Sequence, residues 1–215
     1  MTEKQSDTAW LLTLCCSQIF IMLVFINYSA ILPMLKAEWG MSNTQAGVIF
    51  SVYQLGYIAS GVLLSTLSDR LNIRWIFITA ACWSGVANLL FALYADDYSS
   101  GLILRGLTGI GMGGTYMPGL KLVAERFEST RRGRAVGIYV GALVLGASLS
   151  LVVPGSIAGS FGWRTAMVVC SIGVFFGAAL SLLVFRGYRP PIPKPSPRGF
   201  SGEILHNRPA LLVIL

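Results

Sequence analysis

Six apolar segments, each about twenty residues or longer, follow one another along this 215-residue chain and constrain its fold more than any other feature. The hydrocarbon core of a bilayer is about 30 Å thick, and a helix crosses it in about 20 residues. The apolar runs are continuous, which favours helices over the alternating strands of a barrel. The chain is therefore predicted to be an all-α integral membrane protein. We expect its spans at about 9–32, 43–67, 75–95, 99–120, 135–158 and 163–186.

The charged residues lie almost entirely between these segments and at the chain ends. They make up only 12% of the chain, about half of their share in ordinary soluble domains. With the N-terminus in the cytoplasm, the inner side receives thirteen of the 16 Lys and Arg residues, and the outer side receives only Lys36 and Arg164. The positive-inside rule predicts this orientation. We therefore expect a multi-pass protein of the cell (inner) membrane, with the lipid bilayer as a partner and no nucleic acid.

Arg105 is the only charged residue in the interior of the six segments, because Arg164 and Arg186 lie at the ends of the last one. A charge at that depth costs about 2.5–3.5 kcal/mol on insertion scales, so it normally faces a bundle interior or a wet cavity. Gly109, Met112 and Tyr116 follow it on one helix face. Two roles stay open for Arg105: a charge-assisted contact with an anionic substrate group, or a structural contact between helices. The other polar candidates within the segments are Asn27, Tyr28, Tyr53, Gln54, Asn88 and Tyr139.

Catalysis and metal binding have few candidate residues. The cysteines (Cys15, Cys16, Cys82 and Cys170) all lie in spans, without metal-ligand spacing or a disulfide framework. We therefore expect them to be small buried apolar side chains, and we predict no enzyme, no metal site and no cofactor. No Asp or Glu lies within a span, whereas a proton relay usually needs an intramembrane carboxylate or histidine. The coupling ion, which we expect to be a proton, is therefore not shown by this sequence.

Glycines gather in the fourth and fifth segments. Gly137 and Gly141 have the small-xxx-small spacing that allows close helix contact. Pro154 lies further along the same segment and predicts a bend. The residues expected to serve helix packing are Gly109, Gly111, Gly137, Gly141, Gly146 and Pro154.

The composition changes after residue 186. Residues 187–208 are polar and basic and contain five prolines, which predicts an extended cytoplasmic linker. Residues 209–215 are apolar but too few to cross a bilayer, and Pro209 suits a first helical turn. We expect this stretch to be the truncated start of a seventh helix, and residues 1–186 to be the N-terminal bundle of a longer protein.

Two stretches carry a resemblance to a known family. The loop after the second segment resembles the major facilitator superfamily signature Gly-x-Leu-Ala-Asp-Arg-x-Gly-Arg-Arg. Leu67, Asp69, Arg70 and Arg74 match it in place, whereas Ser65, Ser68, Asn72 and Ile73 depart from it. The fourth segment is similar to the family's helix-4 pattern Arg-x-x-Gln-Gly-x-Gly. Here the matching residues are Arg105, Gly109 and Gly111, with Thr108 in place of Gln, and Glu125 and Arg132-Gly133 follow as in many members.

The resemblance implies the N-terminal six-helix half of a major facilitator-type bundle, arranged as two inverted three-helix repeats. Its implied partners are a missing C-terminal six-helix half and a small-molecule substrate. In this family helices 1, 2, 4 and 5 line the path, which favours Asn27, Tyr53, Gln54 and Tyr139 over Asn88. The family also holds its cytoplasmic side shut with a charge cluster, which favours a latch here over the alternative that these charges are solvated residues that set topology. The implied latch residues are Asp69, Arg70, Arg74, Glu125 and Arg132.

The function predicted from these features is secondary active transport of a small organic solute by alternating access. An anion is favoured because the one buried charge, Arg105, is positive. Two alternatives stay open: an exporter of amphipathic compounds from the same superfamily, and a six-helix oligomeric channel or scaffold protein.

Overall fold

The computed structural model describes residues 2–68 and 71–186, with side chains from residue 7 onward. Across this part of the chain all regular structure is helical, which confirms the all-α prediction. The predicted linker, the 209–215 segment, Asp69 and Arg70 lie outside the described residues. The helices are α1 (Thr2–Met22), α2 (Asn27–Trp39), α3 (Asn43–Leu67), α4 (Ile73–Tyr94), α5 (Tyr98–Arg126), α6 (Ser129–Phe161) and α7 (Trp163–Phe185).

The first predicted span is not one continuous helix. The chain leaves the helical path at residues 23–26, between α1 and α2, and the second helix then runs on to Trp39, past Pro33. At the break, the backbone N–H of Ile26 donates to the hydroxyl of Ser150 on α6, at 3.2 Å. A break within the apolar core is tolerated when neighbouring helices satisfy the freed backbone groups in this way.

Five segments are long and apolar enough to cross a membrane by length and composition: Asp7–Trp39, α3, α4, α6 and α7. The fourth predicted span corresponds to α5, which does not meet that criterion although it is 29 residues long. Its glycines, its hydroxyl side chains and Arg105 reduce its apolar character. Those same residues let α5 run through the middle of the bundle, packed along α3 on one side and α4 on the other.

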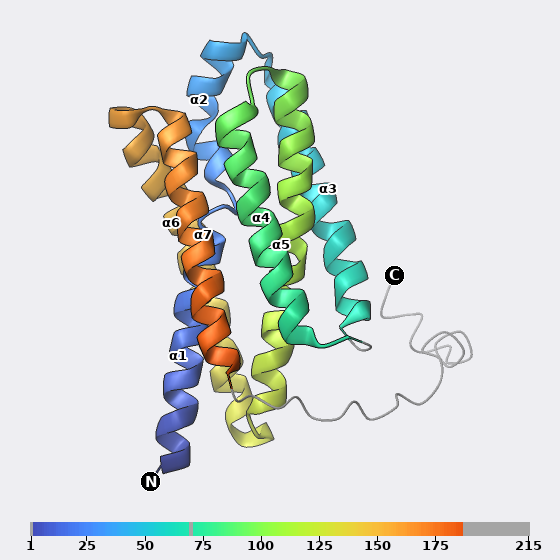
Figure 1. Ribbon diagram of the computed structural model, residues 1–215, viewed down its shortest axis with the longest axis vertical. Helices are drawn as coiled ribbons and strands as arrows, with labels where there is room; N and C mark the ends of the chain where they lie inside the picture. Colours follow the sequence, from blue (N-terminus) through green and yellow to red (C-terminus); the bar gives the residue numbers. More distant parts are fainter. Residues whose placement is uncertain (1, 69–70, 187–215) are drawn as a thin grey trace, which may run out of the picture.

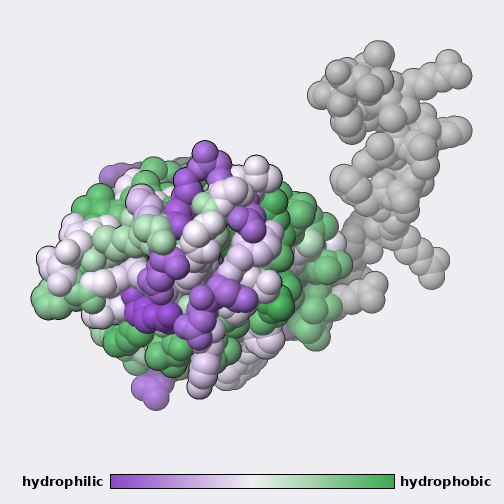
Figure 2. Space-filling view, turned by 90° about the horizontal axis from the view of Figure 1, so that it is seen from above, coloured by the Kyte–Doolittle hydropathy of each residue, from purple (hydrophilic) through white to green (hydrophobic). Residues whose placement is uncertain are grey.

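The helices run roughly along the long axis of the molecule and turn at alternate ends (Figure 1). The N-terminus, the α3–α4 and α5–α6 turns and the end of α7 lie at one end, here called the proximal end. The α2–α3, α4–α5 and α6–α7 turns lie at the distal end. Figure 2 views the distal end, where hydrophilic residues gather on the end face and hydrophobic residues surround them. This distribution suits a bundle that crosses a bilayer along its long axis.

A group of charged and aromatic side chains ties the helices together at the distal end. Arg164 at the start of α7 forms an ion pair with Asp96 at 2.8 Å and reaches Glu38 at 3.6 Å. The indole N–H of Trp163 donates to Glu38 at 2.6 Å. These contacts join the end of α2, the α4–α5 turn and the start of α7.

Some of the predicted packing glycines lie at close helix contacts. A Cβ added at Gly109 would run into the Tyr53 carbonyl oxygen of α3, and one at Gly111 would lie 2.5 Å from the Ser84 nitrogen of α4. At Gly146 an added Cβ would lie 2.7 Å from the Met22 side chain, and Pro154 is buried within α6.

Gly137 and Gly141 do not lie at a close helix contact within the described residues. A Cβ added at either position would meet nothing within 4 Å. Their side of α6 looks away from the other helices described here, as the exposed Ile138 beside them shows. The small-residue spacing is real, but no described helix lies against it.

Candidate functional site

Arg105 lies about two turns into α5 from the distal end, and it is 0% exposed. Its Nη1 donates to the Oδ1 atoms of Asn27 at 3.1 Å and Asn88 at 3.3 Å. Asn27 is the first residue of α2, directly after the break in the first span, and Asn88 lies on α4. The guanidinium therefore joins three helices through one of its nitrogens.

Asn88 extends this network to α7. Its Nδ2 donates to the Met167 carbonyl oxygen at 3.1 Å and to the Ser171 hydroxyl at 2.9 Å. The Asn27 amide also donates to the Asn88 Oδ1, at 3.2 Å. The sequence analysis ranked Asn88 below Asn27, whereas the structure brings both to Arg105. No sequence signal pointed to this contact, because Asn88 lies on a helix that was expected to pack outside the path.

Three aromatic rings surround the guanidinium. Its Cζ lies 4.6 Å from the ring centre of Tyr53, 5.4 Å from that of Tyr28 and 5.9 Å from that of Phe91. Cation–π attraction of this kind contributes about 2 kcal/mol or more when the charge is desolvated. We call Arg105, Asn27, Asn88, Tyr28 and Tyr53 the arginine centre.

The arginine centre leaves several donors and acceptors without a partner among the described residues. They are Arg105 Nε and Nη2, the Tyr53 hydroxyl and, next to it on α3, Gln54 Oε1. Nε and Nη2 form one edge of the planar guanidinium, which is the edge that accommodates a carboxylate through two parallel hydrogen bonds. Buried charged donors normally find partners, so this edge identifies the arginine centre as a candidate anion site.

Tyr139 belongs to a second buried group. Its hydroxyl donates to Gln18 Oε1 on α1 at 2.8 Å, and Gln18 Nε2 has no partner among the described residues. A Cβ at Gly119 of α5 would run into the Tyr139 hydroxyl. Gly119 lies fourteen residues beyond Arg105, or about 21 Å along the helix. We call Gln18, Tyr139 and Gly119 the tyrosine centre.

The structure thus places Arg105 and Tyr139 in separate buried groups, whereas the sequence analysis assigned both to one path. Gln18 was not among the sequence candidates, and the only signal for it was a lone amide in an apolar segment. Tyr116 packs against the same core as Tyr139, and it lines a groove of about 420 Å³ between α3 and α5 together with Tyr57.

Of the five predicted latch residues, Arg74, Glu125 and Arg132 are among the described residues, at the proximal end. Arg74 donates to the Phe185 carbonyl oxygen at 3.0 Å, and Arg132 donates to the Phe127 carbonyl oxygen at 3.4 Å. Within the described ranges, neither forms an ion pair with Glu125.

An ion pair that the sequence analysis did not anticipate lies at the same end. Arg126 of α5 pairs with Asp7 of α1 at 2.7 Å, and its guanidinium lies 4.6 Å from the ring centre of Trp10. The Trp10 indole donates to the Val184 carbonyl oxygen of α7 at 3.0 Å.

In the part of the chain that the structure describes, no group of His, Cys, Asp and Glu could hold a metal ion.

The family profile and the similar proteins agree on one family. The profile of the Major Facilitator Superfamily matches residues 14–215. A probable 4-methylmuconolactone transporter from Cupriavidus pinatubonensis is 34% identical over 59% of this chain and 29% of its own length. A putative niacin/nicotinamide transporter from Bacillus subtilis is 28% identical over 71% of this chain and 38% of its own length.

The solved structures agree in fold. The crystal structure of the POT family transporter PepTSo has a TM-score of 0.77 at 14% identity, over 88% of this chain and 40% of that one. This chain therefore spans well under half the length of these relatives.

Proposed function

The chain belongs to the major facilitator superfamily, and from this premise we propose that its bundle forms one half of a secondary active transporter for small organic anions. The proposed mechanism is alternating access, in which this bundle and a second six-helix half rock about a shared central site. The proposed cargo is a carboxylate of modest size.

The observation that carries this proposal is the unpartnered edge of Arg105. Nη1 is already committed to Asn27 and Asn88, whereas Nε and Nη2 have no partner among the described residues. A carboxylate on that edge would complete the hydrogen bonding of the guanidinium and neutralise a charge that is expensive to bury. The Tyr53 hydroxyl, also unpartnered, is a further donor for the same ligand.

The named cargo of relatives supports an acidic substrate. Besides the two relatives above, similar proteins are named as a probable sulfoacetate transporter and a hexuronate transporter. Niacin, sulfoacetate and hexuronate are organic acids, and all are anionic at neutral pH. Nicotinamide, which is neutral, also appears in one name, so it makes a useful matched probe.

We propose that the proximal end faces the cytoplasm of the cell membrane. Arg74, Arg126 and Arg132 lie at that end, as the positive-inside rule requires. Arg74, Glu125 and Arg132, together with Asp69 and Arg70, would close the path on this side in the outward-open state. The expected coupling ion is a proton, carried by groups of the second half, because the six predicted spans of this chain contain no carboxylate.

The test uses the full-length transporter in a thermal-shift and proteoliposome-uptake experiment. Nicotinate and hexuronate should raise the melting temperature, and nicotinamide should raise it less. Arg105→Gln should remove the difference between acid and amide. Arg105→Lys should weaken it, because an ammonium keeps the charge but lacks the two-pronged edge.

The control variant is Arg131→Gln, which removes an exposed cation at the proximal end. It should leave the difference between acid and amide unchanged. If carboxylates stabilise the wild type and Arg105→Gln equally, Arg105 serves only to join helices and the proposal is wrong.

A further inference from the structure

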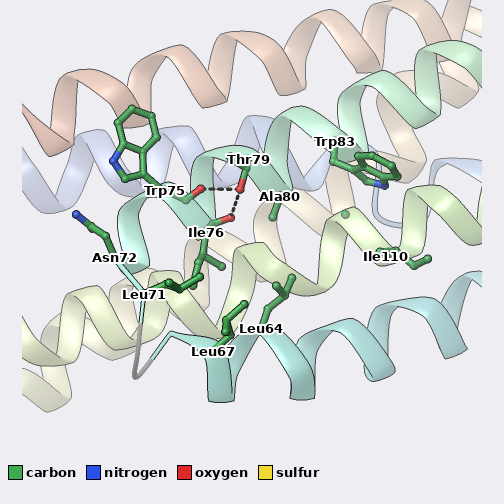
Figure 3. A pocket seen from close by; sticks show the side chains of 11 residues that line it. Leu64, Leu67, Leu71, Asn72, Trp75, Ile76, Thr79, Ala80, Trp83 and Ile110 are labelled. Carbon is green, nitrogen blue, oxygen red and sulfur yellow. Dashed lines mark hydrogen bonds between the residues drawn. The ribbon is translucent and has the colours of Figure 1, made fainter. Parts of the chain in front are cut away.

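A groove of about 550 Å³ runs along the outside of the bundle near the proximal end (Figure 3). Its floor is α5, at Ile110 and Gly111, and its walls are α3 and α4, which both pack mainly on α5. Figure 3 shows Leu64 and Leu67 of α3 on one side and Ile76 of α4 on the other. The groove is independent of the arginine centre, because none of its lining residues contacts Arg105.

The length of the groove matches the depth of one membrane leaflet. It extends along α4 from Asn72, the N-cap of this helix, to Trp83 near its middle. The eleven steps between these two residues rise about 16 Å, and half of the hydrocarbon core is about 15 Å thick. The Trp83 indole closes the upper limit, where its N–H donates to the Leu107 carbonyl oxygen of α5 at 2.9 Å.

The lining above the mouth is suited to hydrocarbon. Its one hydroxyl, on Thr79, is engaged within α4 by the carbonyl oxygens of Trp75 at 2.7 Å and Ile76 at 3.2 Å. Trp75 and Trp83 are 60% and 49% exposed, so two indoles face whatever fills the groove. A polar solute would find no free hydrogen-bonding side chain between Trp75 and Trp83 to replace its hydration.

The groove is also too narrow to enclose a helix. Even with the open space above it included, about 1020 Å³ in all, its mean cross-section over 16 Å is about 64 Å². A helix with its side chains is about 10–12 Å wide and fills about 80–110 Å². A helix could therefore only lie over the groove, whereas an extended chain fits within it.

Two basic residues, Lys121 and Arg74, lie beside the end of the groove at Asn72, which we call its mouth. Lys121 of α5 donates to the carbonyl oxygen and hydroxyl of Ser68, both at 3.4 Å, next to the end of α3. Arg74 lies in the first turn of α4, with its Nε 3.3 Å from the Asn72 side chain. Trp75 sits one residue further on, where an indole suits the boundary between headgroups and hydrocarbon. Basic pockets between helices at the cytoplasmic surface attract anionic headgroups.

We propose that this groove binds a phospholipid with an anionic headgroup from the leaflet at the proximal end. One acyl chain lies between Leu64 and Leu67 on one side and Trp75 and Trp83 on the other. The phosphate lies at the mouth, near Asn72, Arg74 and Lys121.

The test measures lipids retained by the full-length protein after delipidation, by native mass spectrometry. The probes are phosphatidylglycerol and phosphatidylcholine with identical acyl chains. Wild-type protein should retain one phosphatidylglycerol in preference to phosphatidylcholine. Thr79→Phe, which fills the groove from an exposed position, should abolish this retention. Val86→Phe, the same kind of change on an exposed position beyond Trp83, should not.

The headgroup is tested separately. Lys121→Gln should lower the preference for phosphatidylglycerol about fivefold, because one basic residue near the surface contributes about 1 kcal/mol. Arg131→Gln should leave the preference intact.

A second blocking variant guards against a folding defect. Leu67→Phe narrows the groove from the α3 wall and should repeat the result of Thr79→Phe. Equal retention of both lipids by the wild type, or undiminished retention by both blocking variants, would overturn the proposal. So would a protein dimer that forms through Trp75 and Trp83 in place of lipid.

Discussion

The arginine centre and the tyrosine centre are both buried, both lie against a glycine of α5, and both leave polar atoms without a partner among the described residues. They differ in charge and in what the glycine meets. Gly109, beside the arginine centre, faces the main chain of Tyr53, whereas Gly119, in the tyrosine centre, faces the side-chain hydroxyl of Tyr139. The arginine centre joins α2, α4, α5 and α7, and the hydrogen bond of the tyrosine centre joins only α1 and α6.

This difference indicates which centre holds the helices of the bundle rigidly together and which centre tolerates substitution. A buried charge must keep its partners, because removing one leaves an uncompensated ion in a low dielectric. A neutral pair loses only one modest hydrogen bond. We therefore expect the arginine centre to be rigid and intolerant of change, and the tyrosine centre to tolerate substitutions that adjust its side chains.

The largest effect on stability is expected at the glycine beside the arginine centre. Gly109→Ala places a methyl group against the Tyr53 carbonyl oxygen, and backbone cannot move aside as a side-chain tip can. Overpacking of this kind typically costs about 1–3 kcal/mol and sometimes more. The detergent-solubilised protein should melt at a clearly lower temperature, and acid binding should weaken because Tyr53 is displaced from Arg105.

Gly137→Ala is the matched control, because a methyl group there meets nothing within 4 Å among the described residues. Its melting temperature should stay the same or rise slightly, since Ala favours a helix over Gly by about 1 kcal/mol. If both variants lose stability equally, the close approach of α3 to α5 does not control the arginine centre.

A direct comparison of the two hydrogen-bond networks comes next. Asn88→Leu removes an acceptor of the Arg105 charge and two donors to α7, and hydrogen bonds to charged groups contribute about 1.5–3 kcal/mol. Tyr139→Phe removes one neutral bond, and such bonds between membrane helices average about 0.6 kcal/mol. Chemical or thermal unfolding should show the larger loss for Asn88→Leu, and a reversed order would contradict the comparison.

How far the sequence predicts these centres depends on the kind of residue. Arg105 was predicted because a lone charge in an apolar segment is conspicuous. Gln18 was not among the candidates and Asn88 was ranked below Asn27, because an isolated amide on a membrane helix does not reveal its partner. The break between α1 and α2 depends on a hydroxyl 124 residues away, Ser150. The spacing of Gly137 and Gly141 marks a small-residue face but not which helix, if any, lies against it.

A smaller loss of stability, which a second substitution should reverse, is expected for a change at Gly119 of the tyrosine centre. Gly119→Ala directs a methyl group into the Tyr139 hydroxyl, so the unfolding free energy should fall by about 1–2 kcal/mol, within the usual range for overpacking. Tyr139→Phe removes the colliding oxygen. The double variant should therefore be more stable than Gly119→Ala alone, and additive losses in this double-mutant cycle would show that the two groups do not meet.

The smallest effect is a pH dependence at the distal start of α5. Asp97 caps this helix by accepting from the Ser100 backbone N–H at 2.8 Å and from its hydroxyl at 2.6 Å. The hydrogen bond from the Ser100 side chain, with a further one from the Ser100 backbone, lowers the pKa of Asp97 below its usual value. A lowered pKa in the folded state means that the ionised cap stabilises the protein above the unfolded pKa of about 3.9.

That stabilisation should be lost as the pH falls through the lowered folded pKa of Asp97. The protection of the first turn of α5 against hydrogen exchange, measured relative to the intrinsic rate at each pH, should therefore fall below about pH 4, while protection near Gly119 should not. Asp97→Asn still caps the helix but cannot ionise, so the protection of its first turn should be independent of this titration. Equal loss of protection at both positions would mean that acid loosens α5 as a whole, and the two centres would then not be mechanically separate.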